Sequence, residues 1–186
     1  MGQAAVKWTT NAAAFVIVAV SLGLSRIAQA QAPIRIGTSL GMTGVYSEFG
    51  LAVQRGYQLC VNATNSKGGV LGRKLELTVV DDKSEIPAAV AIYERLITQD
   101  KVDLVLGPFS SPITDAVANV TEKHKMPMVA PGARATSIYR KGRKFIFSMN
   151  PPAEIQLEGL IDLAAKKGLK TVALITGDEL YLRAMT

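Results

Sequence analysis

From residue 33 onward, short apolar runs of strand length alternate with longer stretches that have helical periodicity. The apolar runs predict strands at 34–40, 74–80, 103–106, 128–130, 145–147 and 171–175. Most of the stretches between them carry apolar residues at spacings of three and four, which is typical of helices that pack on a sheet. Strands that alternate with helices form parallel sheets, because each helix returns the chain to the same edge. The sequence therefore predicts an α/β fold with a parallel sheet.

Residues that begin and end helices mark the helical stretches. Helices are predicted from near Glu48 to about residue 64, from Pro87 to Gln99, from Pro112 to about residue 123, and over 154–167. Proline suits the first helical turn because its missing N–H has no intrahelical partner there. Ser110 and Ser111 precede Pro112, as expected of residues that cap a helix N-terminus.

The first thirty residues have the pattern of a secretory signal peptide. Lys7 gives a positive start, residues 12–24 form an uncharged run, and Ala28-Gln29-Ala30 fits a cleavage site. A membrane span needs roughly 20 apolar residues, so this run is too short for an anchor. We therefore expect export with cleavage after Ala30.

Composition excludes several classes of site. The chain has 186 residues and a net charge of +6, and it contains one cysteine, Cys60, and one histidine. With no cysteine partner and no Cys/His cluster, we expect no internal disulfide, no metal and no cofactor. Basic residues lie mostly apart and without interleaved aromatics, so nucleic acid is not an expected partner. The one dense basic cluster, at 140–144, is predicted to be a solvated turn.

One motif suggests an enzyme. Ser39 lies in a G-x-S-x-G pattern, and Asp81 or Asp82 and then His124 follow in the order of an α/β-hydrolase triad. However, residues 42–47 separate Ser39 from the next helix, whereas a nucleophile elbow turns directly from strand to helix. His124 is also predicted at the opposite edge of the sheet, roughly 17–20 Å away. A serine hydrolase that uses Ser39 stays as the alternative, and Asp81 and Asp82 are predicted to cap and solvate a strand end.

Open α/β sheets bind ligands at the carboxyl ends of their strands. Three predicted loops lie there: 41–49, 109–111 and 131–136. The hydroxyls of Ser110 and Ser111, together with backbone N–H groups at a helix start, favour an anion such as a carboxylate. The alternative is that these serines only cap the helix.

Residues 34–178 carry a resemblance to a known family. The stretches that carry it are 34–37 with Met42-Thr43-Gly44 and Phe49-Gly50; 65–73 followed by Leu75; Asp81-Asp82 with Pro87-Ala88; Gly107-Pro108 with Ser110-Ser111; and 128–133. They resemble solute-binding proteins of the branched-chain amino acid type, which are the periplasmic receptors of ABC importers.

The resemblance implies a type I periplasmic binding protein fold, in which two α/β lobes close on a ligand. Residues 31–150 are then expected to form the first lobe, a three-layer α/β/α unit, and residues 151–186 the start of the second. Family chains continue through the rest of the second lobe. The resemblance therefore implies a truncated product or a fragment, with a non-functional truncated receptor as a further alternative.

The implied function is binding of a branched-chain amino acid, or a related carboxylated or amide solute, for an inner-membrane ABC permease, without catalysis. The implied ligand-binding residues are Phe49, Ser110, Ser111, Gly132, Ala133, Arg134 and Tyr181. Ser111 resembles the serine that holds the ligand carboxylate, while Phe49 and Tyr181 match aromatic walls of the two lobes. Arg134 departs from the usual Ser or Thr, and a shift of one residue would place Thr136 there instead.

Overall fold

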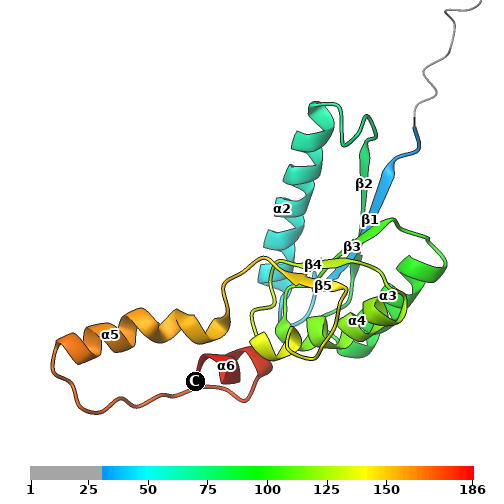
Figure 1. The fold of residues 1–186 in the computed structure, drawn as a ribbon. Helices are drawn as coiled ribbons and strands as arrows, with labels where there is room; N and C mark the ends of the chain where they lie inside the picture. The colour runs from blue at the N-terminus through cyan, green and yellow to red at the C-terminus, as the bar shows by residue number, and fades with distance from the viewer. Residues whose placement is uncertain (1–30) are drawn as a thin grey trace, which may run out of the picture. The chain divides into compact units, whose positions relative to one another are not determined.

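The computed structural model describes residues 31–186, and in it five strands form one parallel sheet (Figure 1). The strands are β1 (Ile34–Leu40), β2 (Leu75–Asp81), β3 (Leu104–Leu106), β4 (Met128–Ala130) and β5 (Ile146–Ser148). Their order in the sheet is β2-β1-β3-β4-β5, and every neighbouring pair is parallel. The predicted α/β class and parallel sheet are confirmed. The predicted strands 34–40 and 128–130 match the observed bounds; β2 and β5 are shifted by one residue at both ends, and β3 begins one residue later than predicted.

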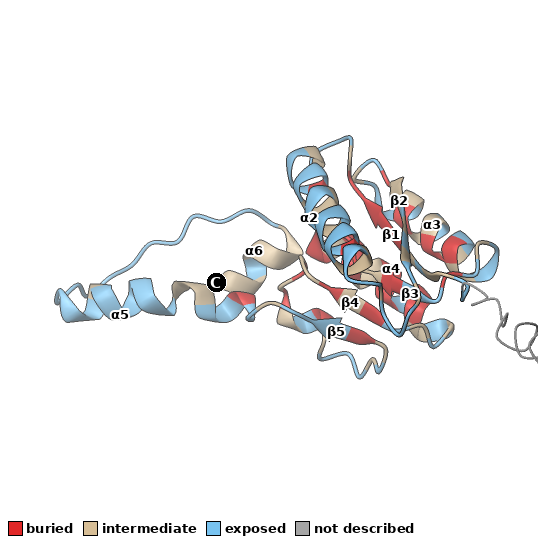
Figure 2. Cartoon of the chain, turned by 90° about the horizontal axis from the view of Figure 1, so that it is seen from above, coloured by how far each residue is buried: buried red, intermediate tan, exposed pale blue. Residues whose placement is uncertain are grey.

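Three helices cover the two faces of the sheet. Helix α2 (Ser47–Ser66) packs on β1 and β2 from one side, and α3 (Ile86–Thr98) and α4 (Ser111–Lys123) pack together on the other (Figures 1 and 2). This arrangement follows from the right-handed crossovers between parallel strands. The chain moves outward from β1 to β2 through α2 and then returns past β1 to β3 through α3, which places these helices on opposite faces.

The hydrophobic core lies between the sheet and the pair α3 and α4. Its members are apolar side chains from the inner faces of these elements, including Tyr93, Leu96, Val105, Val117 and Met128, all at most 1% exposed. The one polar atom of Tyr93, its hydroxyl, donates to the carbonyl of Leu106. The core therefore fixes the starts of α3 and α4 against the sheet edge.

The start of α4 follows the predicted serine cap, with a shift of one residue. The N-cap is Ser110, in an extended backbone conformation, and its Oγ accepts a hydrogen bond from the Ile113 N–H at 3.4 Å. Helix α4 begins at Ser111, so Pro112 lies within its first turn. Ser111 is then not the cap, and its hydroxyl is left for another role.

The segment after β5 differs from the prediction. It contains the 3₁₀ helix η2 (Ala153–Leu157), helix α5 (Glu158–Lys166) and helix α6 (Leu180–Met185). The predicted strand at 171–175 is wrong: these residues are exposed, lie in no helix or strand, and pair with no strand among residues 31–186. A strand needs a hydrogen-bonded neighbour, which apolar residues alone do not supply. Helix α6 was not predicted, and it packs on η2 and α4.

The basic cluster at 140–144 is a turn, as predicted, but it is not fully solvated. Gly142 has a φ of +74°, which permits the turn that follows the 3₁₀ helix η1 (Thr136–Ile138). The Arg143 side chain is only 7% exposed, and its Nη1 lies 2.7 Å from Asp115 Oδ1. Lys141 Nζ lies 2.6 Å from the other oxygen of the same carboxylate. These ion pairs attach the turn to α4.

The Asp115 ion pairs predict a pH dependence of stability. Partial burial acts to raise the pKa of Asp115, but hydrogen bonds from Lys141 and Arg143 outweigh it and hold the pKa below its usual value. A lowered pKa in the folded state stabilises the fold above the unfolded pKa, about 3.9, and this contribution is lost as the pH falls through the folded pKa. Asp115→Asn should therefore lower the free energy of unfolding at pH 7 and flatten its decline below about pH 4.

Urea denaturation at pH 7 and pH 3 measures this effect. Asp162→Asn is the matched control, because Asp162 is exposed on α5 and forms no ion pair with the residues the structure describes. Parallel stability curves for Asp115→Asn and the wild type across this range would contradict the prediction.

Two glycines in α2 should respond oppositely to a methyl group. A Cβ on Gly50 would lie 2.2 Å from the carbonyl oxygen of Gly41, whereas a Cβ on Gly56 would meet nothing within 4 Å. Gly50→Ala should lower the free energy of unfolding by about 1–3 kcal/mol, because α2 must move away from β1. Gly56→Ala should raise it by about 0.5–1 kcal/mol through helix propensity. Chemical denaturation of both variants tests the pair, and equal effects would show that the close contact at Gly41 does not hold α2.

Candidate functional site

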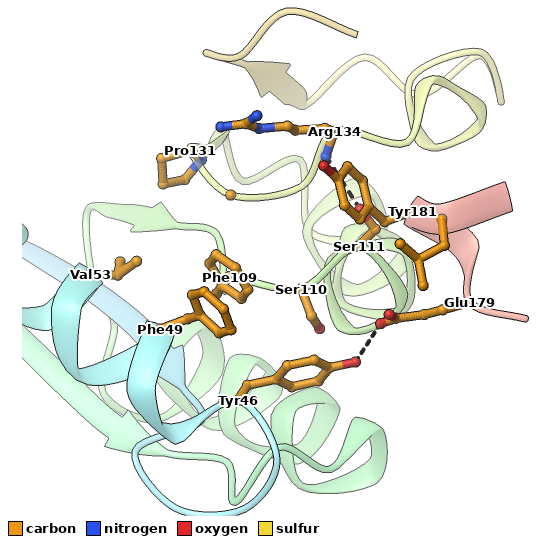
Figure 3. Close-up of a pocket in the computed structure, with 12 residues that line it drawn as sticks. Tyr46, Phe49, Val53, Phe109, Ser110, Ser111, Pro131, Arg134, Glu179 and Tyr181 are labelled. Carbon is orange, nitrogen blue, oxygen red and sulfur yellow. Dashed lines mark hydrogen bonds between the residues drawn. The ribbon is translucent and has the colours of Figure 1, made fainter. Parts of the chain in front are cut away.

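The sheet reverses its direction of winding between β1 and β3. After β1 the chain enters α2 on one face, and after β3 it enters α4 on the other. Ligand crevices open at such points, outside the carboxyl ends of the strands. A cavity of about 570 Å³ lies there, and Figure 3 shows the side chains around it.

One wall of the cavity is aromatic. Phe49 of α2 and Phe109 of the β3–α4 loop stack with ring centroids 4.6 Å apart and an angle of 1° between their planes. Tyr46 packs on Phe109 at 6.3 Å with a tilt of 56°. Val53, one turn further along α2, extends this wall. The stack joins α2 to the β3–α4 loop across the reversal point.

The polar centre of the site is Ser111, at the start of α4. Its side chain is 3% exposed, and its Oγ accepts hydrogen bonds from the N–H groups of Arg134 and Ala135 at 3.2 and 3.4 Å. Its own O–H has no acceptor among residues 31–186. Its backbone N–H lies in the first helical turn, where no intrahelical partner exists. Two donors of one residue are thus available to an anion at the positive end of α4.

The loop after β4 approaches the β3–α4 loop closely. A Cβ on Gly132 would lie 2.3 Å from the carbonyl oxygen of Phe109, so this position requires glycine. Gly132 and Pro131 both line the cavity. Ala133 is fully buried and does not line it; its carbonyl accepts a hydrogen bond from the Tyr139 hydroxyl at 2.7 Å.

Arg134 lines the cavity and Thr136 does not. The Thr136 hydroxyl forms a hydrogen bond with Glu154 instead. The Arg134 side chain extends along the cavity toward Pro131, on the side facing away from Tyr46 (Figure 3). Among the residues that the structure describes, no carboxylate lies within 4 Å of its guanidinium group.

The remaining wall comes from the segment that leads into α6. Glu179, Tyr181 and Leu182 line the cavity. Glu179 and Tyr181 lie opposite the aromatic stack (Figure 3). The Tyr46 hydroxyl donates to Glu179 Oε1 at 2.5 Å, and the Tyr181 hydroxyl donates to Gln156 Oε1 at 2.7 Å. Burial, together with the Glu179 carboxylate, raises the pKa of Tyr46 to about 12. Tyr46 therefore stays neutral as a donor at physiological pH.

Two carboxylates at the end of β2 accept hydrogen bonds from β1, from the loop that follows β1 and from the loop that follows β2. Asp81 accepts hydrogen bonds from the backbone N–H groups of Met42 and Thr43 at 2.9 and 3.2 Å, and from the Thr43 hydroxyl at 2.7 Å. Asp82 is fully buried and accepts from Ser39 Oγ at 2.7 Å and from the Ser84 N–H at 2.9 Å. The predicted strand-end role of the pair is confirmed, although Asp82 is buried rather than solvated.

Comparison with known proteins identifies the family. Residues 33–186 match the family described as periplasmic binding protein. The chain belongs to this family. Its relatives include Leu/Ile/Val-binding protein homolog 7 of Brucella melitensis, 31% identical over 144 residues that cover 77% of this chain and 36% of the relative.

Solved structures of periplasmic binding proteins share the fold. The substrate-binding protein LivJ of Streptococcus pneumoniae, in complex with isoleucine, matches with a TM-score of 0.68 and 30% identity over 73% of this chain and 38% of its own. A solute-binding protein of R. palustris, in complex with benzoate, matches with a TM-score of 0.72 and 26% identity over 82% and 42%. The chain spans about a third of the length of the curated relatives it matches, for instance 30% of BraC3 from Rhizobium johnstonii and 36% of the Brucella protein. The predicted type I periplasmic binding protein fold is confirmed.

The geometry does not support the hydrolase alternative. Ser39 is fully buried inside β1, where its Oγ donates to Asp82, so it does not lie on a strand-to-helix elbow. The His124 ring, just after the end of α4, contacts Glu94 Oε2 at 2.7 Å. Ser39 and His124 therefore have different partners and form no triad. The periplasmic binding protein family is a class of solute-binding proteins.

Six of the seven residues implied by the resemblance line the cavity, and Ala133 lies behind it. The lining residues that sequence reasoning did not single out are Tyr46, Val53, Phe109, Pro131, Glu179 and Leu182. Phe109 and Pro131 could have been predicted as lining residues, because each follows the end of a predicted strand. Glu179 and Leu182 carried no signal, because α6 has only six residues.

Two kinds of feature are absent from residues 31–186. This part of the chain contains no helix with the length and hydropathy needed to cross a bilayer. It also contains no group of three or more His, Cys, Asp or Glu side chains placed to hold a metal ion. Cys60 is exposed and free. The predicted signal peptide at 1–30 lies outside the described residues.

Proposed function

We propose that this chain forms one wall of the solute site of an extracytoplasmic binding protein, which passes a small carboxylated solute to an inner-membrane ABC permease. The observation that carries the proposal is the set of hydrogen bonds that Ser111 makes and leaves free. Its Oγ is already an acceptor for two N–H groups of the β4 loop, so its O–H and backbone N–H remain as donors beside a cavity.

A carboxylate suits these donors. The start of α4 has a positive electrostatic potential from the helix dipole, and Arg134 adds a full positive charge to the same cavity. The ligands named for three relatives support this class. LivJ holds isoleucine, and two R. palustris proteins, both 26% identical to this chain, hold benzoate and 4-hydroxybenzoate. The group that these ligands share is a carboxylate.

The two predicted lobes fit this function. In our proposal residues 31–150 form the first lobe and residues 151–186 begin the second. The sheet ends with β5, and the segment from η2 to α6 adds no strand to it, which supports a boundary near residue 150. Tyr181 and Glu179, which face the aromatic wall, then contribute the second side of a site that closes between lobes.

The site is proposed to bind without catalysis. Its polar groups are hydroxyls, one carboxylate and one guanidinium, and the carboxylate, Glu179, is hydrogen-bonded to the Tyr46 hydroxyl and to neither serine at the α4 start among the described residues. The solute would therefore leave unchanged. Delivery to a permease is the role that the family membership supports.

Ser111→Ala should weaken solute binding by about ten- to a hundredfold, because it removes a charge-assisted hydrogen bond worth roughly 1.5–3 kcal/mol. The probes are isoleucine and benzoate, titrated by calorimetry. Thr121→Val is the matched control: Thr121 is another buried hydroxyl on α4, bonded to the Ala118 carbonyl at 3.2 Å and distant from the cavity lining.

Both substitutions should lower the melting temperature, but only Ser111→Ala should change the dissociation constant. An unchanged dissociation constant for Ser111→Ala would limit Ser111 to holding the β4 loop. If neither probe binds the wild type, the proposed function itself fails.

Export and cleavage belong to the same proposal. The Lys7 start, the apolar run and the Ala28-Gln29-Ala30 site predict a mature N-terminus at Gln31. Mass spectrometry of protein recovered from the periplasm of an expressing Gram-negative host tests this. Recovery of the chain from the cytoplasm with Met1 intact would contradict it.

A further inference from the structure

The side of helix α2 that faces away from the sheet is apolar, whereas the outer side of a surface helix is normally polar. Leu59 is 71% exposed, and Ala52, seven residues earlier, is also exposed (Figure 2). Seven residues are close to two helical turns, so both lie in one row along α2. Val45, in the turn before α2, precedes them at the same spacing and is 83% exposed. These three residues form the α2 outer row.

Two opposite charges accompany this row. Glu48 and Arg55 are exposed and are also seven residues apart, and each lies one helical turn before a member of the row, Ala52 and Leu59. Neither forms an ion pair with another residue in the part of the chain that the structure describes. A carboxylate and a guanidinium are therefore available on the same flank of an apolar row.

We propose that the α2 outer row is the contact between two copies of this chain, with their α2 helices antiparallel about a twofold axis at Ala52. In this register Val45 of each copy lies opposite Leu59 of the other, and the two Ala52 residues face each other. The small Ala52 side chain allows the helices to approach closely at the axis. This interaction is separate from solute binding and does not depend on it.

Charge complementarity selects a second copy and the direction of the helices. In the antiparallel register Glu48 lies within one residue, or about 1.5 Å along the helix, of Arg55 of the second copy. The twofold axis forms this ion pair twice, because each copy uses the same patch. A parallel pair would place Glu48 beside Glu48 and Arg55 beside Arg55, and like charges would then repel.

The size of the contact sets its strength. The two copies overlap over residues 45–59, which is roughly 20 Å of chain along the helix axis. Such a contact lies at the small end of protein interfaces, so we expect a dissociation constant in the micromolar range. The apolar row supplies most of the affinity, and the charges at its rim set the orientation.

Analytical ultracentrifugation of the purified protein, over a concentration series through the micromolar range, measures the dimer. A reducing agent is present throughout, because Cys60 is exposed on the same helix and must not form a disulfide between copies. Leu59→Arg should weaken the dimer by more than about tenfold, since it places a charge in the apolar contact. Leu163→Arg is the matched control: Leu163 is a leucine of α5 that is 53% exposed, and its substitution should leave the dimer unchanged.

A charge exchange tests the register. Glu48→Arg and Arg55→Glu should each weaken the dimer by about three- to thirtyfold, because each removes two ion pairs and adds like charges. The double variant Glu48→Arg/Arg55→Glu should return to within about threefold of the wild type. All four residues of these tests are exposed, and circular dichroism should show every variant folded.

Three results would overturn the proposal. A wild-type protein that stays monomeric through the concentration series would exclude the dimer. A dimer that Leu163→Arg dissociates and Leu59→Arg does not would place the contact on α5. A double variant as weak as either single variant would exclude the antiparallel register.

Discussion

The handedness of the crossovers in a parallel sheet is the constraint on which the site depends. Because each crossover is right-handed, a chain that winds outward from β1 and then returns past it must place α2 on one face and α4 on the other. The two helices therefore start at the same sheet edge with their N-termini beside a common crevice. Ser111, at the start of α4, and the Phe49–Phe109 stack are next to each other for this reason.

Close backbone contacts turn this crevice into a fixed site. Gly50 lets α2 approach the carbonyl of Gly41, and Gly132 lets the β4 loop approach Phe109; a Cβ would lie only 2.2 and 2.3 Å from these oxygens. Asp81 adds hydrogen bonds to the β1 loop. The donors and aromatic rings are thus held by groups outside the cavity, which reduces the entropy lost when a solute binds.

The sequence predicted the elements that are determined by residues close together in the chain. Strands 34–40 and 128–130 match the structure because short apolar runs with turn residues on both sides define them. The prediction of a strand at 171–175 was wrong because a strand needs a second strand to pair with, and the residues of one segment do not show whether that second strand is present. Arg143 looked solvated because its partner, Asp115, lies 28 residues away. The Tyr46–Glu179 contact spans 133 residues, and no spacing rule reaches that far.

The polar groups of the cavity are held in two different ways. The carboxylate donors proposed here belong to a backbone N–H and a hydroxyl at a helix start, and their positions follow from the fold. Arg134 instead reaches the cavity with a side chain that no other described residue holds. A substitution at Arg134 can therefore change the charge that a solute meets without disturbing α4 or the β4 loop.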